Sequence, residues 1–190
     1  MSGSDLKTLF EFANSQLEKS AEWFKANRLT LNVKKTKFML FSNNNLDIGN
    51  NNLKIGDTII EQVGTNCKET YFKFVGHVLD DRLSWEGHVQ HILKKLACAN
   101  FGINSSKNFI PLHLRKIIYY SLFDSHLDFG NLSWGCAKQK VLKKVENLQK
   151  KCIRNIALKS YRAHSEPLFK DLNILKFADR VAYSRSIFMH

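Results

Sequence analysis

The chain has 190 residues, of which 44% are hydrophobic and 24% charged, and this composition is typical of a globular protein with one domain or two small lobes. Its 29 lysines and arginines outnumber 17 acidic residues, and the formal net charge of +12 favours a polyanionic partner, nucleic acid above all, over a merely soluble basic protein. A membrane partner is disfavoured, because no apolar run approaches the roughly 20 residues that span a bilayer and no single amphipathic helix carries the basic excess.

The N-terminal part of the chain predicts a helix followed by short strands. The helix is expected from Asp5 to Ala26, because its apolar residues recur at three- and four-residue steps with acids and amides between them. The run KFMLF from Lys37 to Phe41 is typical of a buried strand. An asparagine-rich loop is expected from Asn43 to Asn52. Gly56-Asp57, which stand between two short apolar runs, then indicate a tight hairpin.

A second pair of strands is expected from Tyr71 to Leu79, where Gly76 indicates a bulge or a close approach of the backbone. From Ser84, the expected N-terminal cap, the apolar period becomes helical. Further helices are expected from Pro111 to about Phe123, from Lys138 to Ile156 and from Asp179 to Met189. The sequence therefore predicts an α+β fold, with the boundary between a mixed part and an all-helical part near residue 83.

The cysteines at 67, 98, 136 and 152 are scattered, without a Cys-x-x-Cys pair, and the polar segment from Met1 has no secretory signal. Both features favour an intracellular protein of the cytoplasm or nucleus. The chain also contains no recognisable Ser-His-Asp arrangement and no glycine-rich phosphate loop, which argues against other classes of enzyme.

Two stretches carry a specific resemblance to a known family. The stretch WFKANRLTLNVKKTKFMLF begins at Trp23, and YFKFVGHVLDDRLSWEGHV begins at Tyr71. They resemble the downstream motifs of reverse transcriptases from LINE-type (non-LTR) retrotransposons, the jockey-like group especially. The family positions are matched in register by Trp23, Asn27, Leu29, Leu31, Asn32, Lys35 and Thr36 in the first stretch and by Gly76, Leu79, Asp80, Leu83, Trp85 and His88 in the second.

Later segments extend this resemblance over nearly the whole chain. They are YYSLFDSHLDFGNLSWG, VENLQKKCIRNI and HSEPLFKDLNILKFADR, which resemble the family's thumb and its continuation. The resemblance implies that residues 1–83 form the C-terminal part of the palm, a helix with short antiparallel strands and a primer-grip-like hairpin. Residues 84–160 would form the helical thumb, and residues 161–190 would begin a C-terminal helical extension.

In this family polymerisation uses Mg²⁺ held by aspartates, one on an upstream strand and two in a Tyr/Phe-Ala-Asp-Asp turn. The chain is expected to begin downstream of that turn. No cofactor is therefore expected in this chain, and the chain alone is not expected to polymerise DNA. The partners that the resemblance implies are an RNA template and an RNA/DNA duplex, with no small-molecule substrate evident.

Two groups of residues could be mistaken for metal ligands. Asp80-Asp81 lacks the aromatic residue two positions before the pair that marks the catalytic turn, so a turn or the approach to a helix is favoured. His88 and His91, three residues apart on an expected helix, could share a zinc ion with Cys98 two turns on. Fewer than four ligands converge, so structural or exposed histidines are favoured. The sequence predicts no metal site.

Near the palm, Lys35 and the hairpin Phe72–Gly76 are the candidate functional positions. Lys35 matches the family's lysine beside the phosphates of the incoming nucleotide, where a cation stabilises developing negative charge. Because catalytic aspartates are not expected in the same chain, the favoured alternative is that Lys35 is an ordinary solvated lysine. The hairpin matches the primer grip, in which Gly76 permits close contact and Lys73 attracts a phosphate. Its phenylalanines could equally fill a core.

Basic residues recur through the helical part of the chain. Those predicted to contact nucleic acid are Lys94, Lys95, Arg115, Lys116, Lys140, Lys143, Lys144 and Lys151. Helical spacing places the last four close to one stripe, while Val141, Val145, Leu148, Cys152 and Ile156 occupy another. One face can therefore pack while the other meets phosphates, and an ordinary solvated face is the alternative.

These observations lead to one main hypothesis and two alternatives. The first is a fragment or decayed copy of a LINE-type reverse transcriptase that keeps the primer- and template-binding parts. The second is a captured module that binds RNA or RNA/DNA duplexes without polymerase activity. The third is a truncated product without function, since an incomplete palm would leave a sheet edge and apolar surface uncovered.

Overall fold

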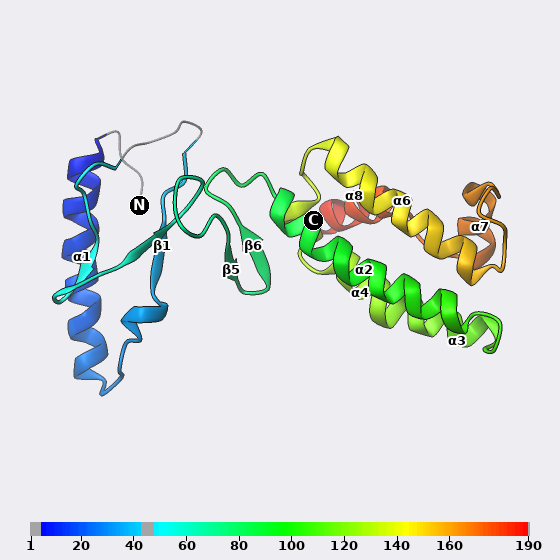
Figure 1. The fold of residues 1–190 in the computed structure, drawn as a ribbon, viewed down its shortest axis with the longest axis horizontal. Helices are drawn as coiled ribbons and strands as arrows, with labels where there is room; N and C mark the ends of the chain where they lie inside the picture. The colour runs from blue at the N-terminus through cyan, green and yellow to red at the C-terminus, as the bar shows by residue number, and fades with distance from the viewer. Residues whose placement is uncertain (1–4, 43–47, 190) are drawn as a thin grey trace. The chain divides into compact units, whose positions relative to one another are not determined.

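The computed structural model describes residues 5–42 and 48–189, which belong to two compact units (Figure 1). The first unit extends to Phe72 and also holds Asp80–Leu83, whereas the second holds Lys73–Leu79 and the chain from Ser84 onward. Helices and short strands together confirm the predicted α+β class. Within the described ranges, the structure has no helix that is both long and apolar enough to cross a membrane.

The first unit combines one long helix with short strands. Its elements are α1 (Leu6–Ala26), the 3-10 helix η1 (Val33–Lys35), β1 (Lys37–Met39), β2 (Lys54–Ile55), β3 (Thr58–Ile59) and β4 (Glu61–Val63). The predicted first helix is thus confirmed, and Asp5 caps it because its carboxylate accepts the Thr8 N–H at 3.1 Å. Phe10 is the buried residue of α1, and it packs with Leu53, Ile55 and Ile60 in a small core.

The pairing of β1 differs from the expectation of antiparallel strands. β1 pairs with β4 in parallel, with Lys37 opposite Glu61 and Met39 opposite Val63. The chain forms the β2–β3 hairpin after β1 and then enters β4 in the direction of β1, which is the crossover that a parallel pair requires. β1 is also only half-buried, and it ends before the expected Phe41.

Both predicted hairpins are present. β2 and β3 pair antiparallel around Gly56-Asp57, where Gly56 has a φ of +58°. β5 (Phe72–Phe74) and β6 (His77–Leu79) are joined by Val75 and Gly76, whose φ values are +45° and +84°. Two successive residues in the left-handed region are typical of a tight hairpin turn. The predicted asparagine loop lies partly outside the described residues, and residues 48–52 contain no helix or strand.

The second unit is helical apart from its hairpin. Its helices are α2 (Glu86–Ser106), α3 (Leu112–Ile118), the π-helix η2 (Tyr119–Asp124), α4 (Ser125–Asp128), α5 (Asn131–Trp134), α6 (Gln139–Ile156), α7 (Ser165–Leu172) and α8 (Phe177–Phe188). The expected helices are confirmed within a few residues. Sequence periodicity did not predict α5 and α7. The N-cap residue of α2 is Trp85, with a φ of +62°, and not Ser84 as expected. The Ser84 hydroxyl lies one residue earlier and accepts the Glu86 N–H at 3.3 Å.

A large aromatic core holds the second unit together. Trp134 is fully buried and stacks on Phe177 with ring centroids 5.0 Å apart. The buried Gln149 of α6 donates to the Tyr119 hydroxyl at 2.9 Å and accepts the Phe177 N–H at 2.9 Å. This amide satisfies buried polar groups from η2 and α8, so α6 is the central helix of the unit.

Candidate nucleic-acid interface

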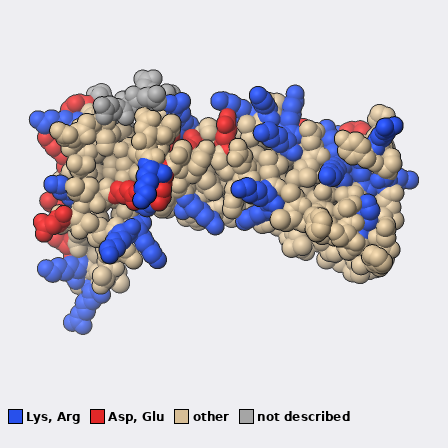
Figure 2. Space-filling model, viewed as in Figure 1, with Lys and Arg blue, Asp and Glu red and all other residues tan. Residues whose placement is uncertain are grey.

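Helix α6 has a basic face and a packing face, as its spacing predicts. The side chains of Lys140, Lys143, Lys144 and Lys151 are exposed. Opposite them lie the buried Leu142, Val145, Gln149, Cys152, Ile153 and Ile156. Glu146, the one acidic residue of α6, is half-buried and lies outside the lysine stripe. Figure 2 shows basic side chains gathered over the helical unit, where acidic side chains are few on the face in view.

Helix α2 lies beside α6 and runs in the same direction (Figure 1). Near the start of both helices, Lys138 Nζ is 3.7 Å from Glu86 Oε1. Near their ends, the buried Asn155 donates to Asn100 Oδ1 at 2.9 Å. Between these contacts the pair Lys94-Lys95 is exposed on α2. The structure therefore brings the predicted lysines of α2 and α6 onto two neighbouring helices.

The prediction that Arg115 contacts nucleic acid is wrong. Its side chain is only 7% exposed, and its guanidinium donates to the Ile156 carbonyl oxygen at the end of α6. The last carbonyls of a helix have no partner within the helix, so Arg115 supplies one of the donors they need. The neighbouring Lys116 is half-buried, and its contact with a phosphate stays a prediction.

The hairpin β5–β6 packs on α2 with its tip exposed. Lys73 and Gly76 are exposed, and Phe74 keeps 59% of its surface exposed, so this phenylalanine fills no core in the described structure. A Cβ on Gly76 would lie 3.0 Å from the ring of Phe129. Gly76 therefore lies close to this aromatic ring, and its contact with a primer stays a prediction.

A stack of rings holds the hairpin on the helical unit, and sequence reasoning did not single out His77. The His77 ring stacks on both His88 and Phe129, each at a centroid distance of 5.0 Å. The Val78 N–H donates to His88 Nδ1 at 3.2 Å, which requires that nitrogen to be unprotonated. Burial, with the nearby charges of His77, His91 and Lys95, lowers the pKa of His88 to about 4. His88 is thus a neutral structural residue at neutral pH.

Asp80 and Asp81 hold a turn. The Asp80 carboxylate is buried and accepts the Arg82 N–H at 3.0 Å. Asp81 accepts from Thr65 twice, from its N–H at 2.8 Å and from its hydroxyl at 2.7 Å. Burial acts to raise the pKa of Asp81, but the Thr65 hydrogen bonds outweigh it and the pKa is lowered. These local bonds support the predicted turn and do not suit a catalytic Mg²⁺ site.

Metal ligands do not converge elsewhere in the described ranges, where no group of three or more His, Cys, Asp or Glu side chains is placed to hold an ion. Lys35 lies in the first unit, exposed at the end of η1, where its N–H donates to the side chain of Asn32 at 3.2 Å. Its role beside a nucleotide phosphate stays a prediction.

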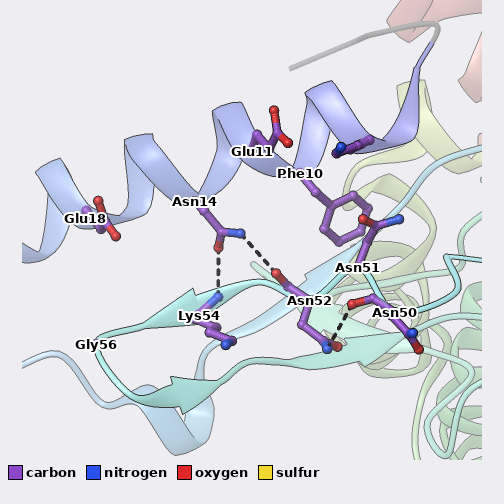
Figure 3. Close-up of a pocket in the computed structure, with 10 residues that line it drawn as sticks. Phe10, Glu11, Asn14, Glu18, Asn50, Asn51, Asn52, Lys54 and Gly56 are labelled. Atoms are coloured by element: carbon purple, nitrogen blue, oxygen red, sulfur yellow. Dashed lines mark hydrogen bonds between the residues drawn. The ribbon is translucent and has the colours of Figure 1, made fainter.

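A polar pocket of about 420 Å³ lies between α1 and the strand β2 (Figure 3). Asn14 accepts the Lys54 N–H at 2.9 Å and donates to the Asn52 carbonyl at 3.0 Å, as a neighbouring strand would. The amide thereby joins α1 to the edge of β2. The rest of the pocket is lined by charged side chains of both signs, the acidic Glu11 and Glu18 and the basic Lys7 and Lys54. The pocket therefore favours neither anions nor cations.

No protein-family model and no solved structure matches the chain. The chain is similar to the probable RNA-directed DNA polymerase from transposon X-element of Drosophila melanogaster, with 25% identity over 112 residues. The match covers 57% of this chain and 12% of that protein, so the chain spans only a small part of this relative. This similarity relates a region of the chain to the reverse transcriptases of retrotransposons.

Proposed function

We propose that this chain is a piece of a LINE-type, jockey-like reverse transcriptase that binds nucleic acid without polymerising it. Residues 1–83 would be the C-terminal part of the palm, residues 84–160 the thumb and residues 161–190 the start of a C-terminal extension. The two motif stretches and the similarity to a transposon polymerase support this assignment. Its partners would be an RNA template and an RNA/DNA duplex, and the helical unit would bind them.

The lysine stripe of α6 is the observation that carries the binding function. Its lysines are exposed on one face, and Lys94-Lys95 of the adjacent α2 add further positive charge. Lysines contact phosphates as point charges, and each contact releases counterions that had condensed on the nucleic acid, whatever the base sequence. The surface is therefore suited to a polyanionic backbone. Lys73 and Gly76 at the hairpin tip would add a contact near a primer end.

Salt-dependent binding of the full chain to an RNA/DNA duplex tests this function. Changing Lys140, Lys143, Lys144 and Lys151 to glutamine should weaken binding and reduce the slope of log K against log salt by about 3.6, since each of the four lost phosphate contacts contributes about 0.9. The matched control changes four exposed lysines of the first unit, Lys7, Lys19, Lys25 and Lys68, to glutamine. Equal losses in both variants would mean that net charge, and not this surface, drives binding.

Primer extension tests the second half of the proposal. Two-metal catalysis needs converging carboxylates, and the local hydrogen bonds of Asp80 and Asp81 do not serve it. Extension of a primer on an RNA template with Mg²⁺ is expected to stay at background. In this proposal Lys35 would act beside a nucleotide phosphate only in a complete enzyme. Robust Mg²⁺-dependent extension would contradict the proposal, and absence of any salt-sensitive binding would favour a product without function.

A further inference from the structure

An open groove of about 500 Å³ lies next to the lysine pair of α2. It is lined by Lys94, Lys95, Cys98, Ala99 and Gly102 from α2 and by Leu122 and His126 from η2 and α4. This lining contains no acidic residue, and Leu122 keeps 54% of its surface exposed. The groove thus has a small apolar floor and a cationic rim.

Gly102 has no side chain that could fill this groove, although its position within a helix is unfavourable for a glycine. It lies in the interior of α2, where glycine is less stable than alanine because it loses more conformational freedom on folding. A Cβ at Gly102 would meet no atom within 4 Å, so packing in the described structure does not demand a glycine. The missing side chain instead leaves free space in the groove that Ala99 and Leu122 also line.

We propose that the groove holds one unpaired nucleotide of the strand that the lysines of α2 and α6 bind. The base would lie on the floor formed by Gly102 and Leu122, and its phosphate would face Lys94 and Lys95. This inference rests on the proposed nucleic-acid-binding function and adds a preference for unpaired over fully paired strands.

The chemistry of the groove supports this occupant. A nucleotide combines a base, whose flat faces have low polarity, with an anionic phosphate, and this combination matches an apolar floor beside two lysines. The volume is within the range of pockets that bind small molecules. Burial, followed by the charges of Lys95 and His91, lowers the pKa of His126, so this ring is neutral at pH 7 and offers another uncharged flat surface.

The test fills the groove without disturbing the fold. In the full chain, Gly102→Leu adds a side chain where a Cβ has free space, and leucine favours the helix. The probes are a single-stranded RNA and a fully paired RNA/DNA duplex of equal length. Gly102→Leu should weaken binding of the single strand about tenfold, as expected for losing one stacked base, and leave duplex binding within about twofold. Circular dichroism checks that the helices remain.

A matched control places the same leucine elsewhere on α2. Ala97 is exposed and does not line the groove, so Ala97→Leu should leave the affinity for both probes unchanged. Unchanged or equally reduced affinity of Gly102→Leu for both probes would overturn the groove inference and leave the proposed function standing. If the unmodified chain binds neither probe, the proposed function fails, and the inference fails with it.

Discussion

The two units of the chain differ most in what holds them together. The helical unit has a continuous core in which Trp134, Tyr119, Phe123 and Phe177 are almost completely buried. Among the described residues, the core cluster of the first unit consists of Phe10, Leu53, Ile55 and Ile60, and its sheets have two strands each. Small two-stranded sheets are marginally stable in water unless a helix covers them. The first unit therefore depends on a few contacts with α1, whereas the helical unit has enough core to be robust.

Trp134→Ala gives the largest expected effect and tests whether the two units unfold separately. Trp134 stacks on Phe177, and its indole N–H donates to the Phe129 carbonyl at 2.8 Å. Its removal should lower the unfolding free energy of the helical unit by about 3–5 kcal/mol. Hydrogen exchange measured on peptides should show lost protection in α2 to α8 and unchanged protection in α1. Equal loss in α1 would show that both units unfold as one.

Acid should weaken the helical unit selectively through His88. The pKa of this residue is about 4 when folded, below its ordinary value of 6.5. Its contribution is therefore fully present above about pH 6.5 and is lost as the pH falls to 4, amounting to about 3 kcal/mol. His91 and His126, whose pKa values are lowered mainly by burial, act in the same direction.

Denaturant unfolding at several pH values measures this effect. In His88→Asn the amide oxygen can still accept the Val78 N–H but cannot take a proton. Stability of this variant should decline less between pH 6.5 and 4 than that of the unmodified chain. An identical decline would mean that His88 does not resist protonation in the folded protein.

Asn14→Ala tests the stability of the first unit and has the smallest expected effect on unfolding free energy. The change removes the two hydrogen bonds from α1 to the edge of β2 and should destabilise the first unit by about 1 kcal/mol. The matched control is the exposed neighbour Ser15→Ala. Hydrogen exchange in α1 and β2 should rise for Asn14→Ala alone. A similar rise in both variants would point to a loss of helix stability and not of the Asn14 bridge.

Local sequence patterns predicted the elements whose formation depends on near neighbours. The periodicity of α1 and α6 follows from residues three and four positions apart, and glycine marked the two hairpin turns. The same periodicity predicted that the lysines of α6 share one exposed face. Short elements such as α7 escaped prediction because a helix of eight residues offers few periods of the pattern.

The sequence by itself thus determined the longer helices, the hairpins, the α+β class and the basic face of α6. Tertiary structure decided the parallel pairing of β1 with β4, the burial of Arg115 against the end of α6, and the stacking of His77 on His88 and Phe129. It also decided that α2 lies beside α6. Each of these features joins residues far apart in the chain, and such contacts arise only when the packed core brings distant segments together.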